Sequence, residues 1–188
     1  MGIAPDDLQR RTLLKSAMAG LAVGFAGAEP ASAADIQPPL RGKPGDFDFL
    51  SGEWRIHNRM LEKGEWIEFP GEATVVGILQ GIASIEELRI PARGFFGMGL
   101  RLLDVEKQVW SDHWVNAKSG VVAVPGQSGG FVDGVGTFTS QDMDGETRVI
   151  YRGVWDRITG TSCRWFQGYS RDGGTTWADT WFMDWTRA

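Results

Sequence analysis

Ten short runs rich in β-branched and aromatic residues follow one another between residues 54 and 186, separated by Gly, Asp and Pro. No long stretch between them carries the apolar spacing of three to four residues that indicates an amphipathic helix. Runs of this length with turn residues between them predict antiparallel strands joined by tight links. The expected strands are 54–61, 66–79, 83–90, 97–103, 109–116, 121–124, 131–140, 147–156, 162–170 and 177–186.

Ten antiparallel strands in one small domain favour closure, because an open sheet leaves two unpaired edges. The sequence therefore predicts an all-β fold, a single antiparallel closed barrel of about ten strands, whose wide interior is filled by side chains or a ligand. All nine Trp follow residue 53, and a single cysteine, Cys163, cannot form an internal disulfide. Stability must then come from packing.

The N-terminus is typical of an export signal. A charged start containing Arg10-Arg11 and Leu14-Lys15 precedes a short apolar stretch, and Ala31-Ser32-Ala33 offers a cleavage site. The apolar stretch is shorter than the roughly 20 residues that span a bilayer. We expect a twin-arginine signal peptide over 1–33, a Pro/Gly-rich linker over 34–45, a barrel over 46–188, and a periplasmic location without a membrane span. The net charge of −5 argues against nucleic acid as a partner.

The stretch SRDGGTTW, residues 170–177, matches the Asp-box pattern S-x-D-x-G-x-T-W. Asp172 can accept hydrogen bonds from turn amides, the two glycines tolerate positive φ, and Trp177 can pack under the turn. We interpret Asp172 and Trp177 as structural residues of a hairpin tip.

A second motif, Gly52-Glu53-Trp54, begins the first expected strand, and Arg187 ends the last one. This pairing resembles the lipocalin-like (calycin) barrels, in which the Trp packs at the closed end against an Arg of the last strand. The stretches FDFLSGEWRIHNR, LRLLDVEKQVWSDHW, FVDGVGTF and RWFQGYSRDGGTTWADTWFMDWTR resemble a bacterial family of lipocalin-like domains of unknown function. The resemblance implies a calycin-type barrel with Trp54 and Arg187 as structural residues, and it brings no established reaction.

Strand alternation separates the faces of the last strands. One face of 147–155 and 163–169 carries aromatics and Gln, and the other carries Arg148, Arg152 and Arg164. Burying unpaired cations is costly, so the aromatic face should line the cavity. The candidate ligand-binding residues are Tyr151, Trp165, Gln167, His113 and Trp114.

Acid–base chemistry has three candidates, which are His57, Tyr151 and Asp184. If Trp54 points inward on a regular strand, His57 points outward, and only a bulge would bring it to the mouth of the barrel. Asp112 and His113 are adjacent, so they should not share a pocket.

Three functions remain open at this point. The first is a protein that binds a small, mostly apolar or aromatic molecule, with a homodimer possible. The second is a cofactor-free barrel enzyme, such as an isomerase, cyclase, hydratase or lyase. The third is a haem-binding barrel, with His57 or His113 as the axial ligand. No metal site is expected, because two histidines cannot supply a three-histidine zinc site.

Overall fold

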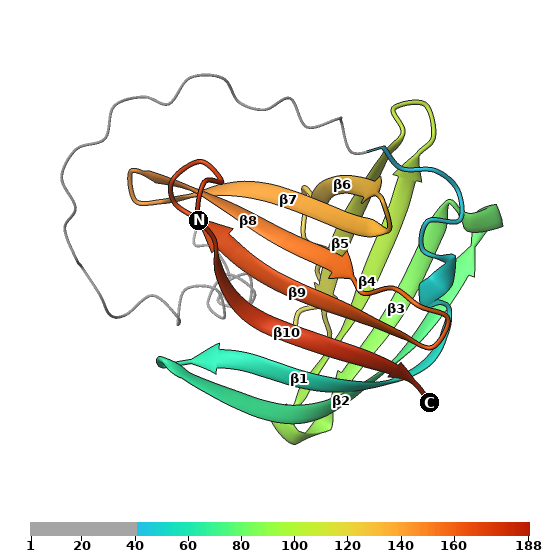
Figure 1. Ribbon diagram of the computed structural model, residues 1–188, viewed down its shortest axis with the longest axis horizontal. Helices are drawn as coiled ribbons and strands as arrows, with labels where there is room; N and C mark the ends of the chain where they lie inside the picture. Colours follow the sequence, from blue (N-terminus) through green and yellow to red (C-terminus); the bar gives the residue numbers. More distant parts are fainter. Residues whose placement is uncertain (1–40) are drawn as a thin grey trace.

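The computed structural model describes residues 41–188 (Figure 1). The expected signal peptide and most of the expected linker lie outside the described residues. Three short 3₁₀ helices, η2, η3 and η4, occupy Asp48–Leu50, Leu79–Gly81 and Pro91–Arg93. No helix in this part of the chain has the length and apolar character needed to cross a bilayer. The strands are β1 (Gly52–Glu62), β2 (Glu65–Ile78), β3 (Ala83–Ile90), β4 (Phe95–Asp104), β5 (Val109–Asn116), β6 (Gln127–Val132), β7 (Val135–Asp144), β8 (Thr147–Asp156), β9 (Ser162–Ser170) and β10 (Ala178–Arg187).

The ten strands form one closed antiparallel barrel in the order β1-β10-β9-β8-β7-β6-β5-β4-β3-β2. Each strand therefore pairs with its neighbours in sequence, and β1 closes the barrel against β10. In Figure 1, β9, β10 and β1 cross the front of the molecule, whereas β3, β4 and β5 form the wall behind them at a steep angle. The structure confirms the all-β closed barrel that the sequence predicts.

The sixth strand differs from the sequence expectation. Residues 121–124 form a link in which Val122 makes one isolated bridge to Val115, and the glycine-rich Gln127–Val132 is the strand. A Cβ at Gly130 would lie within 3.0 Å of the backbone of Arg41. Glycine is needed here because the start of the described chain crosses the strand closely. The expected strand 131–140 is divided by the turn at Asp133-Gly134, both of which have positive φ.

A segment before β1 closes one end of the barrel. Phe47 packs edge-on against Trp110, with ring centroids 4.9 Å apart, and Leu50 is fully buried. The Trp54 indole N–H donates to the carbonyl of Leu50 at 2.7 Å, and the Arg187 guanidinium lies 4.1 Å from the Trp54 ring. These contacts have the geometry of the cation–π pair that the sequence predicts.

Gly52 makes room for this contact. Its φ is +132°, and a Cβ there would collide with the Arg187 guanidinium. Arg187 also donates to the backbone carbonyls of Ser51 and Phe49. The closed end is therefore fastened to the last strand by two hydrogen bonds and an aromatic contact.

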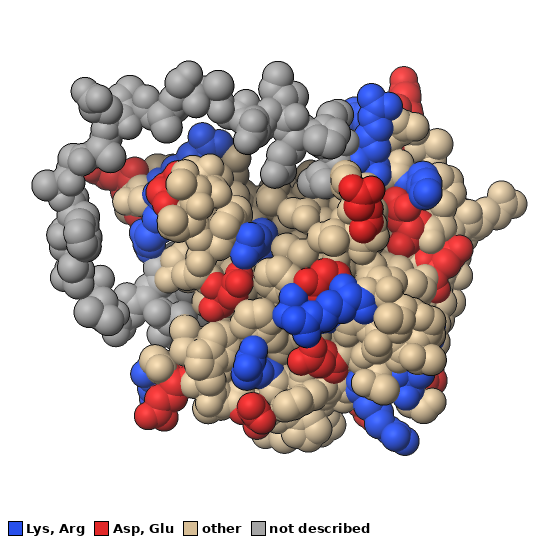
Figure 2. Space-filling view, viewed as in Figure 1, with Lys and Arg blue, Asp and Glu red and all other residues tan. Residues whose placement is uncertain are grey.

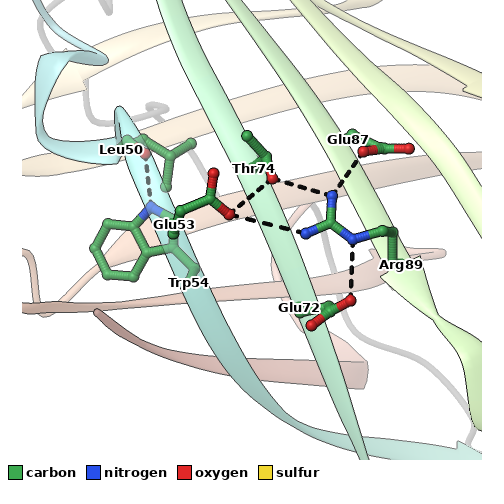
Figure 3. A network of polar contacts seen from close by, with 7 residues as sticks. All are labelled: Leu50, Glu53, Trp54, Glu72, Thr74, Glu87 and Arg89. Carbon is green, nitrogen blue, oxygen red and sulfur yellow. Dashed lines mark hydrogen bonds and ion pairs between the residues drawn. The ribbon is translucent and has the colours of Figure 1, made fainter. Parts of the chain in front are cut away.

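The outer surface carries interleaved charges of both signs on the face shown in Figure 2. One outer network joins β1, β2 and β3 at Arg89 of β3, whose Nη2 lies 3.9 Å from Glu53 Oε2 of β1 (Figure 3). The Arg89 guanidinium donates to Glu72 at 3.1 Å, to Thr74 at 3.0 Å and to Glu87 at 2.6 Å. Burial alone would lower the pKa of Arg89, but Glu72 and Glu87 outweigh it and raise that pKa above its ordinary value.

Candidate functional site

A cavity inside the barrel has a volume of about 50 Å³ and is partly open to solvent. It is smaller than the roughly 300–1,000 Å³ of typical small-molecule pockets, so a larger ligand would have to displace side chains of the lining. A closed barrel of ten strands is itself compatible with small-molecule binding. The lining of the cavity divides into an aromatic wall and a compact charged cluster.

Five tryptophans dominate the aromatic wall. Neighbouring rings pack edge to face. The Trp165 and Trp181 ring centroids are 5.9 Å apart with an interplanar angle of 86°, and those of Trp155 and Trp185 are 5.4 Å apart with an interplanar angle of 60°. Such contacts fix ring orientation. The wall is formed by Trp114, Trp155, Trp165, Trp181 and Trp185.

The charged cluster consists of Glu86, Arg101 and Asp112, on the adjacent strands β3, β4 and β5. The Arg101 guanidinium donates from Nη2 to Glu86 Oε2, and Arg101 Nε lies 3.8 Å from Asp112 Oδ1. All three residues are buried. Gly99 leaves the space for this arrangement, because a Cβ there would lie 3.2 Å from Arg101 Nη2.

The cluster keeps Arg101 charged inside the protein. Desolvation opposes the charge, but the negative charges of Glu86 and Asp112 outweigh it and raise the pKa of Arg101 above its ordinary value. The guanidinium also lies over two rings, 5.1 Å from the centre of Phe47 and 5.3 Å from that of Trp155. These contacts hold the planar group in one orientation.

Several polar groups of the lining have no hydrogen-bond partner within residues 41–188. Arg101 Nε, Arg101 Nη1, Trp155 Nε1 and Trp185 Nε1 are buried and make no hydrogen bond. Arg101 contacts the Trp155 ring and Trp155 contacts Trp185, so the three residues that carry these nitrogens are neighbours in the lining. A buried donor without a partner costs about 1–3 kcal/mol, so these donors are poised to meet an acceptor.

Asp112 is also available for chemistry. Among the described residues its carboxylate makes no hydrogen bond, and its closest charged neighbour is Arg101 Nε at 3.8 Å. A carboxylate that faces a cavity beside a fixed cation can take up or release a proton from a bound molecule.

Three of the residues proposed to bind a ligand line this cavity: Trp114, Trp165 and Gln167. Tyr151 does not reach it, although it shares a strand face with Trp155. Its side chain is partly buried, and desolvation together with Asp142 and Asp144 raises the pKa of Tyr151 above its ordinary value.

The other candidates lie on the outside of the barrel. His57 is exposed and lies 3.2 Å from Glu68, and Asp184 is opposite His57 on β10. The pairing of β1 with both neighbours is regular, so no bulge turns His57 toward the mouth. His113 is partly buried and is not part of the cavity lining; its Nδ1 lies 3.0 Å from the carbonyl oxygen of Ala123, in the link after β5.

The placement of the histidines bears on the haem hypothesis. The lining residues include neither His57 nor His113. The cavity therefore does not supply the axial imidazole that this hypothesis requires, and its residues do not fit such a site.

The arginines of β8 and β9 lie outside, as the alternation of the sequence indicates. Arg164 donates from Nε to Asp156 at 2.8 Å, and Arg152 donates to Asp179 at 2.9 Å. Both guanidinium groups also lie over outer aromatic rings, at 5.0 Å from Phe166 and 4.2 Å from Trp177 respectively.

Sequence reasoning missed the charged cluster. The alternating pattern of FFGMGLRLLD would place Arg101 outside, since Phe96, Met98 and Leu100 fill the opposite face. The structure instead places Phe96 at 40% exposure and buries Arg101. The signal that could have located the site is the pair of glycines, Gly97 and Gly99, which accompany Arg101 on the inner face and leave room there.

The turn between β9 and β10 lies outside this site. Asp172 accepts hydrogen bonds from the Thr176 hydroxyl at 2.6 Å, the Thr176 amide at 2.9 Å and the Ser170 hydroxyl at 2.7 Å. These bonds lower the pKa of Asp172 to about 2, with Thr176 the largest contributor. The Trp177 indole donates to Gly174 at 3.0 Å, so Trp177 packs against the turn.

No protein-family model matches the sequence, and no curated protein matches it at a significant level.

Proposed function

We propose that this protein is an exported, lipocalin-like barrel that binds a small, mostly apolar or aromatic molecule inside the barrel. The observation that carries the proposal is the cavity walled by five tryptophans. Aromatic lining with a few fixed polar groups is typical of small-molecule sites. The contact of Arg187 with Trp54 at the closed end supports the calycin-type assignment, and the turn around Asp172 supports a structural Asp-box.

Two measurements test binding. Mass spectrometry of an organic extract of the purified protein should reveal a co-purified aromatic compound, and isothermal titration calorimetry with indole, coumarin and naphthalene derivatives should detect binding. Trp165→Ala removes part of the wall and should weaken affinity by about tenfold or more, since truncated aromatic contacts often cost 1–2 kcal/mol or more.

Trp66→Ala is the matched control. Trp66 is 45% exposed and packs against Phe182 on the outer face, so its loss should leave affinity unchanged. Equal losses in both variants, or no ligand in the extract together with no binding in the titrations, would contradict the proposal.

Export is tested separately. The sequence predicts that the twin arginines 10–11 direct the folded protein to the periplasm. Cell fractionation should find the wild type in the periplasm and the Arg10→Lys/Arg11→Lys variant in the cytoplasm. A variant that is exported normally would remove the support for the twin-arginine route.

A second candidate is a cofactor-free enzyme of the isomerase or lyase type. It is favoured by the position of Asp112, a carboxylate without a hydrogen bond that faces the cavity next to Arg101. Asp112 would exchange a proton with the bound molecule while Arg101 stabilises developing negative charge. Once a turnover is measured, Asp112→Asn should abolish it while the molecule still binds, whereas unchanged turnover would remove Asp112 from this role.

A further inference from the structure

We infer that the bound molecule carries a neutral hydrogen-bond acceptor, such as a ketone, ester or amide carbonyl, directed at Arg101 and the indole N–H groups of Trp155 and Trp185. This inference rests on the proposed function and names the chemical class of its ligand. It separates the site from one for a plain hydrocarbon and from one for a carboxylate.

The polarity of the unpartnered atoms carries the first step. All four buried groups without a partner in the described lining are donors: Nε and Nη1 of Arg101, and the indole N–H of Trp155 and Trp185. An apolar ligand would leave them unsatisfied after water is displaced, at a cost of about 1–3 kcal/mol for each lost bond. A carbonyl oxygen carries two lone pairs, so a ligand acceptor beside these residues can satisfy some of the donors, whereas a molecule with only donors satisfies none.

The charge of the lining carries the second step. Its charged members are Glu86, Asp112 and Arg101, two carboxylates and one guanidinium. The nearby thiol of Cys163 stays neutral, because burial raises its pKa to about 12. The cluster is therefore net negative without a ligand, and a carboxylate ligand would add a further like charge to a buried site.

The preference for a carbonyl over an anion follows from these two steps together. A carbonyl oxygen supplies lone pairs to the guanidinium and the indoles without a net charge. A site built around such groups discriminates strongly against an analogue that lacks the polar atom, because its own donors are then left unpaired. The aromatic wall around the donors suits a planar ring attached to the carbonyl.

Three naphthalenes of matched size test the inference by calorimetry on the full chain at pH 7.5. They are 2-acetylnaphthalene with a neutral ketone, 2-naphthoate with a carboxylate, and 2-ethylnaphthalene with neither. We expect the ketone to bind about tenfold or more tightly than the other two, the equivalent of about 1.4 kcal/mol. Naphthoate binding most tightly, or the ketone and the hydrocarbon binding equally, would overturn the inference and leave the proposed function standing. If none of the three binds while the extract or another titration shows a ligand without a carbonyl, the inference is overturned; if those measurements also find no ligand, the proposed function is contradicted instead.

Charge variants test the second step. Asp112→Asn removes one negative charge from the cavity, so the affinity for naphthoate should rise about tenfold relative to that for the ketone. Glu87→Gln is the matched control, because Glu87 follows Glu86 on β3 and its carboxylate points outward to Arg89. It changes the net charge of the protein equally and should leave the ratio unchanged.

An unchanged ratio in Asp112→Asn, or an equal shift in Glu87→Gln, would contradict the charge argument. Glu86→Gln provides a second route if Asp112→Asn does not fold, since Gln removes the same charge and still offers an acceptor to Arg101. The comparison of the three naphthalenes on the wild type needs no variant.

Discussion

Removing Arg101 tests the charged cluster most directly. Arg101→Met keeps the apolar stem of the side chain, but it leaves the buried carboxylates of Glu86 and Asp112 without their cation. Removing one partner of a buried ion pair costs about 3–5 kcal/mol. The contacts with the rings of Phe47 and Trp155 disappear as well, at about 0.5–2 kcal/mol each.

We therefore expect loss of the ion pair alone to lower the free energy of unfolding of Arg101→Met by about 3–5 kcal/mol at pH 7, and the lost ring contacts to add to this. For a chain of this size each kcal/mol corresponds to roughly 2–4 °C, so the ion-pair loss alone should lower the Tm by about 6–20 °C. Urea unfolding followed by tryptophan fluorescence, together with a thermal melt by circular dichroism, measures both quantities.

The triple variant Arg101→Met/Glu86→Gln/Asp112→Asn separates charge from packing. Replacing a whole buried charged group by neutral residues is often close to neutral for stability. The triple variant should recover most of the loss, and Arg164→Met, which breaks an outer pair with Asp156, should cost only about 1 kcal/mol. If Arg101→Met costs no more than Arg164→Met, the cluster is not the desolvated ion network that its burial indicates.

Three further predictions concern the rest of the barrel. Burial raises the pKa of Cys163 to about 12 from an ordinary 9.0, so the stabilisation by the neutral thiol is complete below pH 9 and is lost as pH rises toward 12. The difference in unfolding free energy between wild type and Cys163→Ala should therefore shrink over that range by up to about 1.4 kcal/mol per pH unit. A difference that stays constant would contradict this prediction. Hydrogen bonds from Thr176 and Ser170 lower the pKa of Asp172 to about 2, so the stabilisation that they give is complete above pH 4 and is lost as pH falls toward 2. The unfolding free energies of wild type and Asp172→Asn should therefore converge as the pH falls toward 2. Curves that stay parallel would disagree with this assignment. Arg187→Met loses two hydrogen bonds and the contact with Trp54 and should lower the free energy of unfolding by about 1–3 kcal/mol, whereas the exposed Arg55→Met should change it by less than about 0.5 kcal/mol in urea titrations.

The fold was largely predictable because each strand of this barrel pairs with its sequence neighbours. In such a barrel the strand order follows from the positions of the strands and turns along the sequence. Nine of the ten expected strands overlap a strand of the structure. The error at β6 has a tertiary cause. Glycines that look like a loop in the sequence form a strand because the segment at Arg41 and Gly42 passes within contact of Gly130.

The site was predictable only where polarity and burial agree. On β9, Trp165 and Gln167 line the cavity because the alternative face carries arginines that find carboxylates outside. On β4 the same reasoning fails. Arg101 is stabilised inside by Glu86 and Asp112, which come from two different strands, and no local pattern indicates that these three side chains meet.

The buried charged cluster and the unpaired N–H donors beside it are costly for stability, but they suit a ligand-binding site. A buried cluster of charges seldom stabilises a fold more than apolar residues of similar volume would, and here two nitrogens of Arg101 and two neighbouring indole nitrogens make no hydrogen bond. Some of these donors gain a partner when an acceptor enters between the cluster and the tryptophans. Ligand binding and stability should therefore be linked, so that a saturating ketone raises the Tm of the wild type and raises it less in the triple variant, where Arg101 no longer donates.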